Sequence, residues 1–284
     1  MNYEILRLAI VLIGTGIAAF QDFKTSYIDD KLTLIMIVAG VALDFLTFDS
    51  GFIFYSVGVG ALIFIIGYYF YRTGQIGGGD VLLVAGIQVL LPFYPSIQQF
   101  QFPFSLAVTS VPFIITVFAT SALISLVGTA LVYGWALKGK KLKPDFKDSL
   151  LTLVLMVVII FSIYFFSAFG LYQIIFVLLL AIPSVFLSLF KTQIMNEIII
   201  QKVGLKEVED EDVLALDKMT GLKKYGLKRV ATKDQMEVLK KISRDKKGQK
   251  FYVYKNLPRM APYILIGLIL SLILGNPFAW ILFK

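Results

Sequence analysis

The 284-residue chain contains no histidine and no cysteine. The first absence excludes Ser-His-Asp and Cys-His catalysis, and together they exclude metal sites built from His or Cys. Without cysteine there are also no disulfides and no iron–sulfur clusters. Any hydrolytic chemistry must therefore use carboxylates, Lys, Tyr, Ser or Thr.

Charge is also scarce. Only 16% of the residues are charged, against about 25% in ordinary soluble domains, and 58% are hydrophobic. A chain with so little polar material cannot cover the surface of a water-soluble domain of this length, and it is too apolar to be disordered. The composition predicts a membrane protein.

Long charge-free stretches recur along the chain, and about 20 apolar residues are enough for a helix to cross the hydrocarbon core. We predict an all-α polytopic membrane protein, a bundle of about eight transmembrane helices (six to eight) with a small cytoplasmic α/β insert. The predicted spans are Leu8–Gln21 with Ile5 and a snorkelling Arg7, Leu32–Phe48, Ser50–Tyr71, two within Val81–Leu137 separated by a Pro- and Gln-rich loop, two within Ser149–Phe190 joined by a tight turn near Ser167–Gly170, and Met260–Phe283.

The basic residues predict the orientation of these spans. With eight spans and both termini outside, 25 of the 27 Lys and Arg residues fall in connections on one side, and only Arg7 and Lys284 fall on the other. Because cytoplasmic loops carry an excess of Lys and Arg, that side is expected to be the cytoplasm. The predicted location is the cell membrane.

The segment Lys191–Arg259 is the one long polar part of the chain, with 17 basic and 10 acidic residues. Within it we expect a short helix at Thr232–Ile242 and a short strand at Phe251–Tyr254. Its charge suits attachment to an anionic inner leaflet, but a solvated positive loop explains the charge equally well. The predicted domains are a helix bundle at 1–190, this insert at 191–259, and a final helix at 260–284.

Charged residues at membrane depth are expensive and are functional candidates for that reason. Asp22 ends the first span and shares a helical face with Gly14 and Ala18. Small residues on one stripe mark a contact face between membrane helices, so Asp22 is expected to point into the bundle. Taken alone, Asp22 is more typical of an ordinary interfacial carboxylate at a helix end, because charges are common at span ends.

Asp80 follows three glycines, Gly77, Gly78 and Gly79, and opens the fourth span. Glycine lets a backbone approach its neighbours closely, and Asp is a favoured residue at a helix start, where the helix dipole stabilises its charge. An isolated Asp here could therefore be a simple helix cap.

The pair is more informative than either residue. Two spans separate Asp22 from Asp80, which puts both on the cytoplasmic side. Two neighbouring carboxylates can share one proton, so that one acts as a general base on water and the other as a general acid. Asp44 and Asp49 lie at the outer side without a partner in this scheme and are expected to be structural. Lys24 and Arg72 lie close in sequence to the two aspartates; either could lower the pKa of a carboxylate, but we expect them to face water.

These residues resemble a known family. Gly77-Gly78-Gly79-Asp80 fits the G-x-G-D motif, with Asp22 58 residues upstream and followed by Lys24 and by Ile28-Asp29-Asp30. The pattern is similar to the G-x-G-D aspartic peptidases, specifically the type IV prepilin peptidases and archaeal preflagellin peptidases. Asp29-Asp30 stand where bacterial members have Pro-Asn, which resembles the archaeal branch. Pro258-Arg259-Met260-Ala261-Pro262 resembles the proline-flanked start of the family's final helix.

The resemblance implies an aspartic endopeptidase that removes a short basic leader from preflagellin or prepilin at the cytoplasmic membrane face. It implies Asp22 and Asp80 as the catalytic pair and Gly77 and Gly79 as motif glycines. Asp29 and Asp30 could contact the basic leader through their charge, or could be ordinary turn residues. The implied partners are the substrate protein and the bilayer; no cofactor, metal or nucleic acid is expected, and the oligomeric state stays open.

Two other functions use the same aspartates. A presenilin-like peptidase shares G-x-G-D, but its Pro-Ala-Leu near the last helices is absent and Gln21 stands where it has Tyr. A cation transporter would place the aspartates at the membrane midplane between inverted repeats, whereas both lie at span ends here. The sequence leaves open whether the substrate is a pilin or a flagellin, and which Asp carries the proton.

Overall fold

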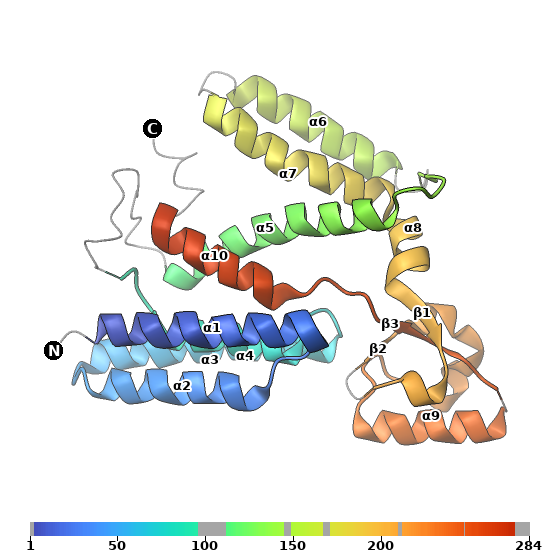
Figure 1. Ribbon diagram of the computed structural model, residues 1–284, viewed down its shortest axis with the longest axis horizontal. Helices are drawn as coiled ribbons and strands as arrows, with labels where there is room; N and C mark the ends of the chain where they lie inside the picture. The colour runs from blue at the N-terminus through green and yellow to red at the C-terminus, as the bar shows by residue number, and fades with distance from the viewer. Residues whose placement is uncertain are drawn as a thin grey trace. The chain divides into compact units, whose positions relative to one another are not determined.

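The computed structural model describes residues 3–95, 112–144, 149–166, 171–209, 212–246 and 248–275. The chain forms two compact units. The first unit comprises the described parts of 1–71, 75–125 and 259–284, and the second unit comprises those of 72–74 and 126–258. The structure is mostly helical, with one small antiparallel sheet in the second unit (Figure 1).

In the first unit the helices lie close to the predicted spans. Their bounds are α1 Glu4–Thr25, α2 Asp30–Phe45, α3 Ser50–Arg72, α4 Gly78–Leu90, the first half of α5 Phe113–Ala136, and α10 Met260–Leu274. Helix α4 packs on α1 and α2, and α10 packs along α1 (Figure 1). The predicted contact face of α1 is confirmed, because Gly14, Ala18 and Asp22 are all buried.

Helix α4 approaches its neighbours at glycines. A Cβ atom on Gly40 of α2 would lie 2.8 Å from the Val89 side chain. In α3, a Cβ on Gly60 would lie 2.7 Å from Val89, and one on Gly67 would lie 2.4 Å from Val81. Real Cβ atoms do not come this close, so glycine at these three positions is what lets α4 pack against the α2 and α3 backbones.

The eight predicted spans are represented by α1 to α7 and α10, but their capacity to cross a membrane differs. Within the described residues, α1, α3 and α5 are long and apolar enough to span. A fourth candidate is the pair Ile174–Leu189 and Lys191–Ile199, which is bent by 65°. Gly78–Leu90, Thr152–Phe165 and Met260–Leu274 are shorter apolar helices. The predicted turn at Ser167–Gly170 and most of the Pro- and Gln-rich loop lie outside the described residues.

The prediction that Arg7 snorkels to the surface is wrong, as is the prediction that Asp44 lacks a partner. Arg7 Nη1 lies 2.7 Å from Asp44 Oδ1, and both side chains are buried. Arg7 Nη1 also donates to the carbonyl oxygens of Val89 (3.4 Å) and Leu90 (3.3 Å), while the Ser56 hydroxyl donates to Val89 (3.1 Å). The two charges pair because α1 and α2 are antiparallel and bring them to the same end of the bundle.

Asp49, which the sequence analysis grouped with Asp44 as structural, has a different environment from Asp44. It is exposed, and its Oδ1 accepts a hydrogen bond from the Phe52 N–H at 3.1 Å. Asp49 therefore satisfies a free N–H group in the first turn of α3, which is a structural role at a helix end.

The second unit contains the end of α5, a helical hairpin and the polar insert. The helices are α6 Ser149–Phe166, α7 Leu171–Leu189 and α8 Lys191–Ile194, and α6 packs along α7 (Figure 1). The polar insert begins with α8, and a π-helical turn, Met195–Ile199, connects this helix to the first strand.

The insert folds around its own small apolar core. Strands β1 Ile200–Val203, β2 Val213–Leu214 and β3 Phe251–Tyr254 form an antiparallel sheet in the order β1-β3-β2, with Val203 opposite Phe251. Helix α9, Lys233–Asp245, completes it (Figure 1). The predicted helix at Thr232–Ile242 and strand at Phe251–Tyr254 are confirmed. The fully buried core side chains include Leu214, Leu239, Ile242, Phe251 and Val253.

We expect Asp44→Asn to lower the free energy of unfolding by about 3–5 kcal/mol, because it leaves the buried Arg7 guanidinium without a counter-charge. The measurement is reversible unfolding in mixed micelles. Asp49→Asn is the matched control, since the exposed side chain keeps its acceptor oxygen. Equal stability of the two variants would contradict the buried ion pair.

Candidate active site

Asp22 lies in the last turn of α1 and points into the first unit. Its side chain is 7% exposed, and Oδ2 accepts a hydrogen bond from the Ala261 N–H at 3.0 Å. Ala261 is in the first turn of α10, where the backbone N–H groups have no partner inside the helix and a negative charge is favoured. The start of α10 therefore holds one oxygen of Asp22 in place.

Arg259, the residue immediately before α10, completes this arrangement. Its guanidinium donates to the Phe23 carbonyl oxygen and lies 5.3 Å from the centre of the Phe23 ring. The positive charge also interacts with the Asp22 carboxylate. The sequence interpretation considered Lys24 and Arg72 as cations near the aspartates and did not consider Arg259. The proline-flanked segment Pro258–Pro262 was the signal that could have identified it.

Asp80 is the third residue of α4. One of its carboxylate oxygens is hydrogen-bonded to the Gly77 backbone. The other, Oδ1, is buried and has no hydrogen-bond partner among the described residues. The charges of Asp22 and Asp80 are close enough to interact. The two aspartates thus lie at the same end of the bundle, opposite to the Arg7–Asp44 pair.

At each of the three glycines before Asp80, a side chain would meet a different neighbour. A Cβ on Gly79 would lie 2.8 Å from the Cβ atom of Ile28, and one on Gly78 would lie 3.3 Å from the Tyr71 ring. A Cβ on Gly77 would lie 3.0 Å from Asp80 Oδ2. The close contact of Gly79 with Ile28 brings the start of α4 against the turn that follows α1, and so brings Asp80 toward Asp22.

Asp29 and Asp30 lie at the start of α2, but their carboxylates have different surroundings. The Asp29 carboxylate caps the helix by accepting from the Lys31 N–H at 3.0 Å, and its own N–H donates to Gln21 Oε1 at 3.1 Å. Asp30 is exposed. Of the two residues considered for contact with a basic leader, Asp30 has the freer carboxylate, while Asp29 is engaged in local structure.

The site has the elements of acid–base chemistry between two carboxylates. Asp22 is held in place by the Ala261 backbone N–H. Asp80 has a buried oxygen available to a water or a carbonyl group. Among the described residues, no group of three or more Asp and Glu side chains is arranged to hold a metal ion.

The segment that carries both aspartates is similar to a known peptidase family. Residues 9–129 match the type IV leader peptidase family, and this confirms the resemblance seen in the G-x-G-D pattern. The match covers less than half of the chain and likens this segment to the leader peptidases.

The chain is also similar to three proteins that are named as prepilin or preflagellin peptidases. The chain is 34% identical over 139 residues to prepilin peptidase EppA of Methanothermobacter thermautotrophicus, which covers 47% of this chain and 36% of the relative. It is 37% identical over 90 residues to a preflagellin peptidase of Methanococcus voltae, a match that covers 30% of this chain and 38% of the relative. It is 30% identical over 86 residues to a preflagellin peptidase of Methanocaldococcus jannaschii, a match that covers 29% of this chain and 36% of the relative. The matches thus span less than two fifths of each relative's length.

Gly79→Ala is expected to destabilise the protein by about 1–3 kcal/mol, because the new methyl group overlaps Ile28 and forces the start of α4 to move. Gly58→Ala in α3 is the matched control, since a Cβ there meets nothing within 4 Å. In a helix that substitution is otherwise neutral or stabilising. Chemical unfolding of both variants tests this, and an unchanged stability of Gly79→Ala would show that α4 does not approach Ile28 this closely.

Proposed function

We propose that this protein is a membrane aspartic endopeptidase in which Asp22 and Asp80 are the catalytic pair. The observation that carries the proposal is that both aspartates of the family-matched segment lie at the same end of the helix bundle, where Asp80 Oδ1 has no hydrogen-bond partner among the described residues. One carboxylate activates a water as general base, and the other donates a proton toward the scissile carbonyl. Gly77 and Gly79 position Asp80.

The proposed substrates are prepilin-type or preflagellin-type proteins, from which the enzyme removes a short basic leader. The relatives' names support this, since all three are prepilin or preflagellin peptidases. The exposed carboxylate of Asp30 near the end of α1 provides a negative charge that would attract a basic leader, with a smaller contribution from Asp29.

The proposed topology has eight spans, both termini outside, and the aspartates at the cytoplasmic face. The distribution of Lys and Arg supports it. Because the chain has no cysteine, single cysteines report the sides directly. A membrane-impermeant thiol reagent should label Asp49→Cys in intact cells and Tyr27→Cys only after permeabilisation. The reverse pattern would contradict this orientation.

Asp22→Asn and Asp80→Asn should each lower the rate of leader cleavage at least a hundredfold, roughly the contribution of a positioned acid or base. The assay uses the purified full chain in proteoliposomes with a membrane-embedded prepilin or preflagellin. Asp49→Asn, which changes a carboxylate at the opposite end of the bundle, should cleave normally. Cleavage at the normal rate by either site variant would show that the pair is wrongly assigned.

Asp29→Asn/Asp30→Asn should raise the KM for a basic leader about two- to fivefold at low salt and leave kcat unchanged, the size expected for exposed charges. Asn is also a good helix cap, so α2 should keep its start. The difference from the parent protein should shrink as salt is added. An unchanged KM at low salt would remove these residues from leader recognition.

A further inference from the structure

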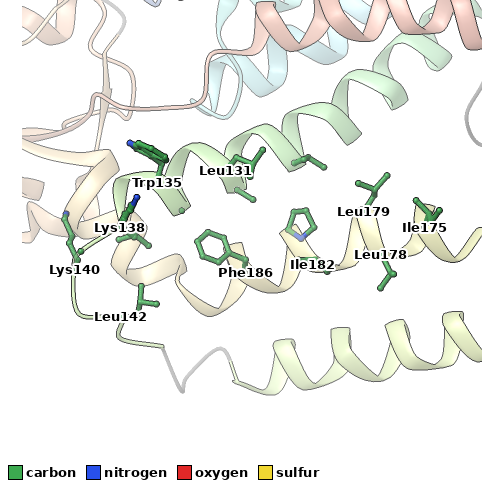
Figure 2. Close-up of a pocket in the computed structure, with 16 residues that line it drawn as sticks. Leu131, Trp135, Lys138, Lys140, Leu142, Ile175, Leu178, Leu179, Ile182 and Phe186 are labelled. Atoms are coloured by element: carbon green, nitrogen blue, oxygen red, sulfur yellow. The ribbon is translucent and has the colours of Figure 1, made fainter.

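The second unit contains an apolar groove between α5 and α7 with a volume of about 900 Å³ (Figure 2). Its long walls are made of aliphatic and aromatic side chains from both helices, and both helices come from apolar segments that are candidates for membrane spans. The wall residues used in the argument below are Ala130, Leu131, Leu178, Leu179, Ile182 and Phe186. A groove of this kind faces hydrocarbon when the helices are in a bilayer.

One end of the groove is basic. Lys138 and Lys140 line it beside Trp135 (Figure 2). The Lys138 ammonium lies 4.8 Å from the centre of the Trp135 ring, and Trp135 is 75% exposed. An exposed tryptophan next to lysines is characteristic of the membrane–water interface. The groove therefore extends from the headgroup level at this end into the apolar layer.

The basic end is a fixed piece of structure. Gln193 is buried; its side chain accepts from the Lys143 N–H at 3.0 Å and donates to the Lys141 carbonyl at 3.1 Å. This holds the loop after α5 against α8. Lys140 pairs with Glu197 at 3.3 Å, which offsets part of its charge. Lys138 stands over the aromatic ring and has no acidic partner among the described residues.

We propose that this groove is a binding site for one membrane lipid with an anionic phosphate headgroup. The headgroup lies at Lys138 and Lys140, and the hydrocarbon chains lie along Leu131, Leu179 and Ile182. Basic pockets between membrane helices bind anionic headgroups in this way. The same lysines disfavour a basic leader peptide, and a second copy of the chain would bring the same positive end to the groove. Charge therefore selects the anionic lipid among the occupants.

Tryptophan fluorescence tests this proposal. The chain has two tryptophans, so Trp280→Phe leaves Trp135 as the single reporter at the basic end of the groove. This protein is reconstituted in phosphatidylcholine vesicles that contain matched fractions of brominated phosphatidylglycerol or brominated phosphatidylcholine. We expect the anionic lipid to quench Trp135 at about tenfold lower mole fraction, since each lysine near the headgroup contributes roughly a fivefold preference and Glu197 offsets part of it.

Three variants distinguish binding in the groove from attraction by general surface charge. Lys138→Gln/Lys140→Gln should remove the preference, whereas Lys240→Gln/Lys241→Gln, an identical charge change on exposed lysines of α9, should retain it. Ala130→Phe, which fills the groove and keeps both lysines, should reduce the preference as well. Quenching is normalised to each variant's own fluorescence, because Lys138 contacts the reporter.

Three results would overturn the proposal. Equal quenching by both brominated lipids would mean that only bulk lipid reaches Trp135. A full preference in Lys138→Gln/Lys140→Gln would place the anionic lipid elsewhere. Protection from both lipids, together with a dimer by size-exclusion chromatography with light scattering, would show that a second copy covers the groove.

Discussion

The ion pair between Arg7 and Asp44 joins α1 to α2, and the same guanidinium donates to the last carbonyl oxygens of α4. Ser56 adds α3 to this cluster. The final carbonyls of a helix have no partner within it, and a cation near them is favourable. In a bilayer, where no water is at hand to satisfy these groups, such a cluster is worth more than at a wet surface. It fixes the end of α4 that is remote from the candidate site.

The position of Asp80 follows from this constraint. With its far end fixed, α4 passes α3 and α2 at glycines that permit close backbone approach, and its first turn meets Ile28 at Gly79. Asp22 lies about 22 Å from Arg7 along α1, 15 residues at 1.5 Å each, so the two polar clusters occupy opposite ends of the same helices. Asp22 is in turn held by the start of α10. The proposed catalytic pair thus depends on contacts among α1 with the turn that follows it, α4 and α10.

The sequence predicted the features that depend on composition and local pattern. Hydrophobic runs located the helices, and the stripe of Gly14, Ala18 and Asp22 predicted a buried face, because side-chain spacing in a helix is fixed. The G-x-G-D pattern pointed to the family and to both aspartates. Even the short helix α9 and strand β3 of the insert could be located from their periodicity.

The features that were missed depend on pairing between distant segments. Arg7 near a chain end is indistinguishable in sequence from a snorkelling residue until α1 and α2 are known to bring it to Asp44. Arg259 lies 237 positions from Asp22, and no local rule connects them. The capping role of Asp29 was within reach, since Asp is a common residue at a helix start, but the sequence interpretation considered only leader contact or an ordinary turn.

The central claim is that the fold places Asp22 and Asp80 side by side. The most direct measurement is cross-linking of Asp22→Cys/Asp80→Cys by a short bifunctional thiol reagent in the membrane, which is clean because the chain has no other cysteine. The account predicts efficient intramolecular cross-linking in this pair and none in Asp22→Cys/Asp49→Cys, whose cysteines lie at opposite ends of the bundle. Failure of the first pair to cross-link while both of its cysteines react with a monofunctional reagent would contradict it.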